Sequence, residues 1–278
     1  MALSPPAVDA VLQWLLETHG FDFRQYKRPS LERRLQQRIL LSGASDAWAY
    51  LKRLKEEPEE VHRLLATLTI KVSHFFRDPL VFEFLRKRVI PDLIRQKEAA
   101  EDRTLRIWSA GCAAGEEAYS MALVMAELVE KKAERLEVFI LGTDVDEVAL
   151  ERAREGFYEP ESLQEVRKGI LDRYFQPVGN GYRIAESIRR MVHFSLYPLT
   201  APTPSPPAGV FATYDLILCR NVLIYFDLSL QEQVVAKFLE ALAPGGLLVL
   251  GESELLPEAH RGRFHRVTDT CKIFQKTL

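Results

Sequence analysis

Apolar residues recur at helical spacing through the first seventy residues of the chain. One run extends from Val8 to Leu16 and another from Leu31 to Leu40, each with apolar positions three or four residues apart. This period places the apolar side chains on one face of a helix, and no strand-like alternation interrupts it. We therefore expect a small all-helical N-terminal domain over residues 1–75. A connecting helix and linker should follow over residues 76–103.

From residue 104 onward, short apolar runs alternate with helical patterns. Strands are predicted at 104–108, 138–141, 191–195, 215–219 and 247–250. Continuous apolar strands separated by helices are typical of a doubly wound, mostly parallel sheet covered on both faces. Residues 104–278 are thus predicted to form a Rossmann-like α/β domain. The more polar stretch 156–190, with a hairpin turn at Gly179-Asn180-Gly181, predicts a small inserted β subdomain.

Composition narrows the possible functions. The chain has 278 residues and a net charge of −2, so the molecule as a whole does not attract nucleic acid or an anionic membrane. Three widely spaced cysteines and six scattered histidines show neither disulfide nor metal-ligand spacing. The start of the chain lacks the features of a signal peptide, and no apolar run reaches the roughly 18 residues of a membrane span. We expect a cytoplasmic protein with no metal and no direct membrane insertion.

The loop Ser109–Gly115 follows the first predicted strand, where doubly wound sheets bind their ligands. Gly111 and Gly115 allow the backbone to pass close to a ligand. Glu116 and Glu117 open the next helix and would repel a pyrophosphate, but they suit a cationic sulfonium ligand that carries an amino group. The alternative is a helix that only favours acids in its first turn.

The second strand ends at Asp144, and Asp146 follows two residues later. A carboxylate at that strand end can accept hydrogen bonds from ribose hydroxyls. Asp146 is expected to cap the next helix. The loop, the acidic strand end and the sheet together favour a nucleoside cofactor. A dinucleotide is disfavoured by Glu116 and Glu117 and by the absence of the middle glycine of the dinucleotide-binding motif.

Three segments carry a resemblance to a known family: Ser-His-Phe-Phe-Arg-Asp at 73–78, the loop region 108–120, and Cys-Arg-Asn-Val-Leu-Ile-Tyr-Phe at 219–226. Together they resemble the CheR family, the chemoreceptor glutamate methyltransferases of bacterial chemotaxis, over nearly the whole chain. The resemblance implies a class I S-adenosylmethionine-dependent methyltransferase with a helical N-terminal domain and an inserted subdomain. It further implies methyl transfer to glutamate carboxylates on the helical bundle of methyl-accepting chemoreceptors, which leaves S-adenosylhomocysteine.

The resemblance also assigns roles to particular residues. Arg77 would orient the incoming carboxylate and Tyr225 would lie across the transfer path from it. Glu116 would hold the methionine amino group and Asp144 the ribose. The remaining cofactor positions are Ser73, Gly111, Ser195, Leu196, Asn221 and Val222, with Arg77 also counted among them. From the sequence alone, Arg77 could equally form a surface ion pair with Asp78, and Phe75, Phe76 and Phe226 are expected in the core.

Two positions depart from the family pattern. Lys71 stands where the family often has an asparagine, so an amide contact there is in doubt, whereas Ser73 keeps a hydroxyl. Ser195 precedes Leu196 where the family commonly shows Asn-Leu, which leaves the adenine contacts uncertain. The inserted hairpin is short, so we expect weak or no dependence on a receptor tail peptide.

Residues 24–38 hold six cations and one acid, a local charge of +5. Arg34 and Arg38 share a helix face, with Arg33 beside them. We expect Arg33, Arg34 and Arg38 to dock on the acidic receptor bundle; the alternative is an ordinary solvated face. Nucleic acid is disfavoured because the segment is short, has few aromatic residues and belongs to a net-negative chain. A monomer is expected.

Three other functions are considered as alternatives to a receptor methyltransferase. A scaffold without activity is disfavoured because Arg77 and Tyr225 are both present. An NAD-type oxidoreductase is disfavoured by Glu116 and Glu117. A methyltransferase for a small molecule or nucleic acid is left as an alternative.

Overall fold

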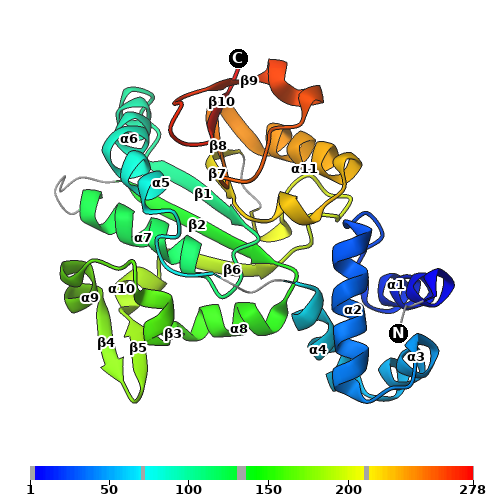
Figure 1. Ribbon diagram of the computed structural model, residues 1–278. Helices are drawn as coiled ribbons and strands as arrows, with labels where there is room; N and C mark the ends of the chain where they lie inside the picture. The colour runs from blue at the N-terminus through cyan, green and yellow to red at the C-terminus, as the bar shows by residue number, and fades with distance from the viewer. Residues whose placement is uncertain (1–3, 70–72, 130–135, 210–212, 278) are drawn as a thin grey trace.

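The N-terminal helices form a separate group beside the sheet (Figure 1). The computed structural model describes residues 4–69, 73–129, 136–209 and 213–277, so Lys71 lies outside the described residues. The group consists of α1 Pro5–His19, α2 Arg28–Ser42, α3 Ala47–Glu56 and α4 Pro58–Leu68. Its own apolar core is built by the positions at helical spacing, Val8 and Leu35 among them. Within the described part of residues 1–75, the predicted helical character is confirmed.

A buried ion pair joins three of these helices. Glu60 of α4 is fully buried and accepts two hydrogen bonds from Arg38 of α2, at 2.6 and 2.7 Å. The Tyr50 hydroxyl of α3 donates to the same carboxylate at 2.9 Å. Arg38 therefore compensates a charge inside the domain. This geometry does not favour the predicted docking of Arg38 on a receptor, because its guanidinium is already engaged and only 14% of its side chain is exposed.

The connection to the second domain is one helical stretch with a wider turn in its middle. It runs through α5 Pro79–Phe84, the π-helical segment η1 Leu85–Val89 and α6 Ile90–Ala99. Pro91 has no N–H to donate to the carbonyl four residues earlier, and a π turn just before it re-pairs the backbone. The stretch packs against the sheet and ends a few residues before β1.

A seven-stranded sheet forms the second domain, in the order β6-β2-β1-β7-β8-β10-β9. The parallel strands are β1 Thr104–Ala110, β2 Glu137–Asp144, β6 Val192–Leu196, β7 Tyr214–Cys219 and β8 Leu242–Leu250. Helices α5, α6 and α7 Glu116–Val129 share a core with one face, and α11 Leu228–Ala241 covers the other (Figure 1). The helix α8 Glu147–Glu155 follows β2. The doubly wound, mostly parallel prediction is confirmed.

Two antiparallel strands at the C-terminal edge were not predicted. They are β9 Phe264–Arg266 and β10 Ile273–Lys276, and β10 pairs with β8. Each is only three or four residues long and holds no more than two apolar residues, so neither shows the apolar run that marked the parallel strands. They cover β8, which would otherwise be the exposed edge of the sheet.

The inserted segment forms a second, three-stranded sheet. Its elements are β3 Phe157–Tyr158, η2 Pro160–Leu163, α9 Lys168–Tyr174, β4 Phe175–Val178, β5 Gly181–Ile184 and α10 Glu186–Arg189. The strand order is β3-β5-β4, and the β4–β5 hairpin closes at Gly179, which has φ 57°. The predicted hairpin and subdomain are confirmed. No helix among the described residues is long and apolar enough to span a membrane.

Replacing Arg38 by methionine should destabilise the N-terminal helices, because it removes both short hydrogen bonds to the buried Glu60 carboxylate and leaves only the more distant Arg63, at 3.5 Å, as its cation. We expect a loss of roughly 3–5 kcal/mol in the free energy of unfolding, measured by urea denaturation. The matched control is Arg33→Met on the same helix, an exposed arginine whose loss should change stability by less than about 0.5 kcal/mol. Equal effects of the two variants would contradict the assignment.

Candidate functional site

A pocket of about 1180 Å³, including its open mouth, lies at the carboxyl edge of the parallel strands. Loops after β1, β2, β6 and β7 converge there, as expected for a doubly wound sheet. The wall of the pocket includes Ser73, Arg77, Gly111, Ala113, Glu117, Asp144, Asn221, Val222 and Tyr225. Seven of the predicted site residues thus meet in one cavity: Ser73, Arg77, Gly111, Asp144, Asn221, Val222 and Tyr225.

The glycine-containing loop after β1 is tied to the end of β2. The backbone N–H groups of Gly111 and Cys112 both donate to the Thr143 carbonyl, at 2.8 and 2.9 Å. Gly111 has φ 80°, and a Cβ built on it would lie 2.4 Å from the Val222 side chain. Only glycine fits this contact, which brings the loop after β1 against the loop after β7.

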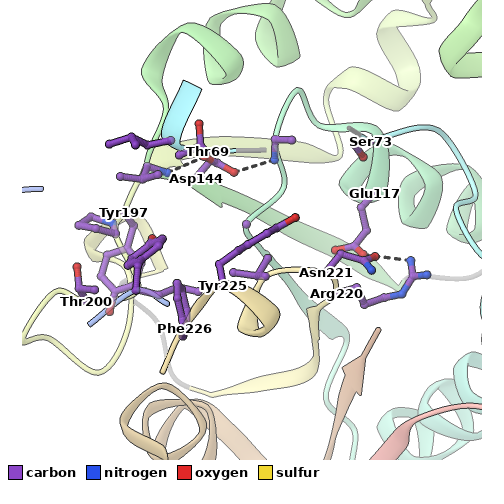
Figure 2. A pocket seen from close by; sticks show the side chains of 18 of the residues that line it. Thr69, Ser73, Glu117, Asp144, Tyr197, Thr200, Arg220, Asn221, Tyr225 and Phe226 are labelled. Atoms are coloured by element: carbon purple, nitrogen blue, oxygen red, sulfur yellow. Dashed lines mark hydrogen bonds and ion pairs between the residues drawn. The ribbon is translucent and has the colours of Figure 1, made fainter. Parts of the chain in front are cut away.

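Asp144 ends β2 and points into the pocket (Figure 2). One carboxylate oxygen accepts from the Ala113 N–H at 2.9 Å, and the other from the N–H groups of Val145 and Asp146. Burial raises the pKa of Asp144, and these three amides oppose the rise. A carboxylate held by its own backbone in this way keeps lone pairs for hydroxyls of a ligand. Asp146 caps α8 through Val148 and Ala149, as predicted.

Glu117, and not Glu116, faces the pocket. Successive helical residues are about 100° apart, so only one of the two acids at the start of α7 can point to the cavity. Glu116 is buried on the inner side, whereas Glu117 lines the pocket and accepts from Arg220 at 3.3 Å (Figure 2). The structure therefore corrects the prediction that placed Glu116 against the ligand. Burial raises the pKa of Glu117, and the Arg220 guanidinium opposes the rise.

Glu116 has a different environment. It is 6% exposed, and burial raises its pKa to about 7, with the Ser73 hydroxyl partly opposing the rise. One of its carboxylate oxygens is buried and has no hydrogen-bond partner among the described residues. Because Ser73 lines the pocket and Glu116 lies behind it, Glu116 supports the cavity wall from inside.

The loop after β7 is held by a residue that sequence analysis missed. The Glu254 carboxylate accepts from four backbone N–H groups, those of Asn221, Val222, Leu223 and Gly251, at 2.6–3.0 Å. This fixes Asn221 at φ 62° and starts the short helix η4 Leu223–Tyr225. Tyr225 then projects across the middle of the pocket, between Asp144 and Asn221 (Figure 2). Glu254 lies about thirty residues after the segment 219–226, and no sequence pattern connects the two, so the sequence could not reveal this role.

Arg77 lies on a strained turn at the opposite wall. Its neighbours Phe76 and Asp78 have φ 54° and 57°, values that non-glycine residues adopt rarely and mostly at functional sites. Asp78 pairs with Arg220 at 2.6 Å, so its carboxylate is already engaged by a second arginine. Phe75, Phe76 and Phe226 are buried in the core, as predicted.

The N-terminal domain closes one side of the pocket. Phe21, Asp22, Phe23 and Tyr26 from the α1–α2 connection line it, together with Leu68 and Thr69 after α4. The Lys27 N–H donates to the Tyr225 carbonyl at 2.8 Å, and the Tyr26 and Phe226 rings pack edge to face at 4.9 Å. Burial, with Asp144 and Asp22 nearby, raises the pKa of Tyr26, so its hydroxyl stays protonated. No motif marked these residues, because they approach the site only in the folded chain.

The three predicted docking arginines have different surroundings. Arg34 lies over the Tyr225 ring, 5.0 Å from its centroid, and donates to the Leu68 carbonyl. Arg38 belongs to the buried pair with Glu60. Arg33 alone among them is exposed and shows no ion pair in the part of the chain that the structure describes. Arg34 thus packs between the N-terminal domain and the loop after β7. Of the three arginines predicted to dock on a receptor, Arg33 is the one whose side chain is exposed.

Two further predicted cofactor residues, besides Glu116, do not reach the cavity. Ser195 and Leu196 pair with Thr143 and Asp144 across the β2–β6 ladder, but neither lines the pocket, and Leu196 is 45% exposed. The wall at this point is made by the next residues, 197–200. The loop after β6 thus begins as pocket wall, and Lys237 holds it by donating to the Leu199 and Ala201 carbonyls.

The fold and the pocket define a class I methyltransferase with a nucleoside site at the carboxyl edge of its sheet. The comparisons with known proteins agree. The family described as "CheR methyltransferase, SAM binding domain" matches residues 71–273, and its "all-alpha domain" matches residues 6–69. The chain belongs to the CheR methyltransferase family, and its cofactor is S-adenosylmethionine.

Curated relatives span most of the chain. A putative methyltransferase, Cher3, of Pseudomonas putida is 33% identical over 93% of this chain and 92% of its own length. A chemotaxis protein methyltransferase of Vibrio cholerae is 32% identical, covering 91% and 88%, and one of Escherichia coli is 30% identical, covering 91% and 86%. An uncharacterized 104.1 kDa protein of Rhodobacter capsulatus is 34% identical, and the chain spans 25% of it.

Glu116 should make stability depend on pH. Its ordinary pKa of 4.5 is raised to about 7 in the folded chain, so the protonated form stabilises the fold below pH 4.5 and this contribution is lost as the pH rises to about 7. Glu116→Gln mimics the protonated form at every pH. We expect the variant to gain up to about 3 kcal/mol on wild type between pH 5 and pH 8, measured by urea denaturation. A stability difference that stays constant with pH would contradict the buried, protonated carboxyl.

Proposed function

We propose that this chain transfers a methyl group from S-adenosylmethionine to glutamate side-chain carboxylates of chemoreceptors, giving glutamate methyl esters and S-adenosylhomocysteine. The observation that carries the proposal is the convergence of two acids, Glu117 and Asp144, with Arg77 and Tyr225 in one cavity. In this assignment Glu117 receives the cofactor's amino group and Asp144 its ribose. Asn221, Val222 and Gly111 border the cofactor, with Ser73 beside its amino end.

The reaction requires alignment more than proton transfer. A glutamate with an ordinary pKa of about 4.3 is already an anion at neutral pH, so no general base is needed. One carboxylate oxygen attacks the methyl carbon, the carbon–sulfur bond breaks, and its electron pair stays on sulfur. The planar fork of Arg77 can bind the carboxylate at two points and aim one oxygen at the methyl group. Tyr225, which crosses the pocket, bounds the transfer path on its other side.

Recognition of the receptor is a separate step. The carboxylates that accept methyl groups lie on acidic helices by family resemblance, and Arg33 is an exposed cation on α2. An exposed charge of this kind acts chiefly on the rate of encounter. The β4–β5 hairpin closes with a two-residue turn between Val178 and Gly181, which offers little surface for a tail peptide. We propose that the enzyme acts as a monomer in the cytoplasm.

Methyl transfer is tested with tritiated S-adenosylmethionine and receptor cytoplasmic fragments, by release of volatile tritiated methanol in base. We expect label that is lost in base, as a methyl ester requires. Arg77→Lys should lower the turnover number on the order of 100-fold, because an ammonium cannot hold both carboxylate oxygens. Arg95→Lys, an exposed arginine on α6, is the matched control and should leave turnover unchanged. Base-stable label, or none from wild type, would refute the glutamate ester assignment.

Docking through α2 is tested by varying the enzyme and the receptor together. Arg33→Glu should lower kcat/KM for receptor fragments on the order of threefold to tenfold, more at low salt, and leave S-adenosylhomocysteine affinity unchanged. Lys52→Glu, an exposed cation of α3, is the control for charge reversal. Deleting the receptor's C-terminal pentapeptide should leave kcat/KM unchanged for both the wild-type enzyme and the Arg33→Glu variant. The α2 docking proposal would be contradicted if deleting the pentapeptide lowered kcat/KM while Arg33→Glu remained as active as wild type. Docking would then be assigned to the inserted subdomain.

A further inference from the structure

Arg220 is a charged side chain in the interior of the second domain, beside the pocket. Its side chain is 2% exposed and lies over the Phe82 ring at 5.3 Å. One terminal nitrogen donates to Asp78 at 2.6 Å and to the Arg77 carbonyl at 2.7 Å. The other donates to Glu117 at 3.3 Å (Figure 2). One guanidinium thus joins the turn that carries Arg77 to an acid of the cofactor pocket.

Stability alone is a poor reason for such a group. Buried ion pairs are often no more stabilising than well-packed apolar residues of similar volume. The hydrogen bonds of Arg220 are instead directed at the turn that carries Arg77 and at Glu117 of the pocket. Its planar fork reaches both segments at once, which a single ammonium cannot do.

The turn that carries Arg77 depends on these contacts. Arg77 lies between Phe76 and Asp78, both with positive φ, so its backbone has no regular secondary structure to hold it. The Arg220 hydrogen bonds to the Arg77 carbonyl and to the Asp78 carboxylate hold the turn on the C-terminal side of the Arg77 side chain. On the N-terminal side, the Phe76 N–H donates to the Ser120 hydroxyl at 2.9 Å.

Two carboxylates, Glu117 and Asp78, share the Arg220 cation. An ammonium group arriving at Glu117 would supply a second positive charge and leave more of the Arg220 interaction for Asp78. Because Asp78 does not line the pocket, any effect of Asp78 on ligand affinity must pass through other residues.

We propose that Arg220 is a positioning residue that couples the binding of the cofactor's amino end at Glu117 to the conformation of the turn carrying Arg77. The proposal rests on the functions proposed above for Glu117 and Arg77. Cofactor binding would then control the position of Arg77, because Glu117 and the turn that carries Arg77 contact the same guanidinium.

The test is a double-mutant cycle read by calorimetry with S-adenosylhomocysteine, which carries the amino group and needs no receptor. Asp78→Asn should weaken S-adenosylhomocysteine binding about threefold to tenfold in the wild-type background, and less than twofold in the Arg220→Lys background. Asp92→Asn, which removes an exposed carboxylate paired with Arg95, is the control and should leave affinity unchanged. Arg220→Lys should also lower kcat for methyl transfer by about tenfold or more.

Equal effects of Asp78→Asn in the two backgrounds would overturn the coupling, since the two residues would then act independently. If Arg220→Lys does not fold, Asp78→Asn alone decides, because unchanged affinity in that variant overturns the proposal. The binding cycle is independent of the methyl acceptor. A receptor that gains no methyl ester would therefore refute the proposed function and leave the result of the cycle intact.

Discussion

The loop after β7 keeps its conformation because the buried Glu254 carboxylate accepts four backbone N–H groups. An acceptor-only carboxylate can satisfy several donors that regular structure leaves unpaired, and here it does so for Asn221, Val222, Leu223 and Gly251. Asn221 can then hold a left-handed conformation in a chain segment with no ladder partner of its own. The side chains on either side of this anchored stretch form the site: Arg220 before it and Tyr225 after it.

Those anchored residues also determine where the N-terminal domain attaches. The backbone pairing of Lys27 with Tyr225, and of Asp227 with Gln25, joins the α1–α2 connection to the residues directly after η4. Arg34 covers the Tyr225 ring from the same side. A displacement of the loop after β7 would therefore move the cofactor wall, the Tyr225 ring and the helical domain together. The all-helical domain is a structural part of the pocket as well as the carrier of an exposed basic residue.

The fold followed from the sequence wherever the signal was local. Apolar runs located the parallel strands, and Asp146 capped α8 as its position predicted. The short strands β9 and β10 lacked that signal because their pairing with β8 is long-range. The site shows the same division. Gly111 and Asp144 were predictable from strand ends, whereas the choice between Glu116 and Glu117 depends on the helix phase, which neighbouring acids do not reveal. Arg34 and Arg38 looked like a docking face because their partners, Tyr225 and Glu60, are remote in sequence.

The chemistry explains why aromatic rings line much of the pocket wall. Transfer from a sulfonium to a carboxylate consumes one positive and one negative charge, so the transition state carries less charge separation than the reactants. Water stabilises the separated charges and thereby opposes the reaction, and a site that excludes water removes that opposition. The rings of Phe21, Phe23 and Phe226 serve this purpose along the pocket. In the role proposed for it, Arg77 would bind the carboxylate more strongly before its charge is lost than after, so its contribution would come from orientation. A turn held by Arg220 and a Tyr225 held by the helical domain would provide that orientation.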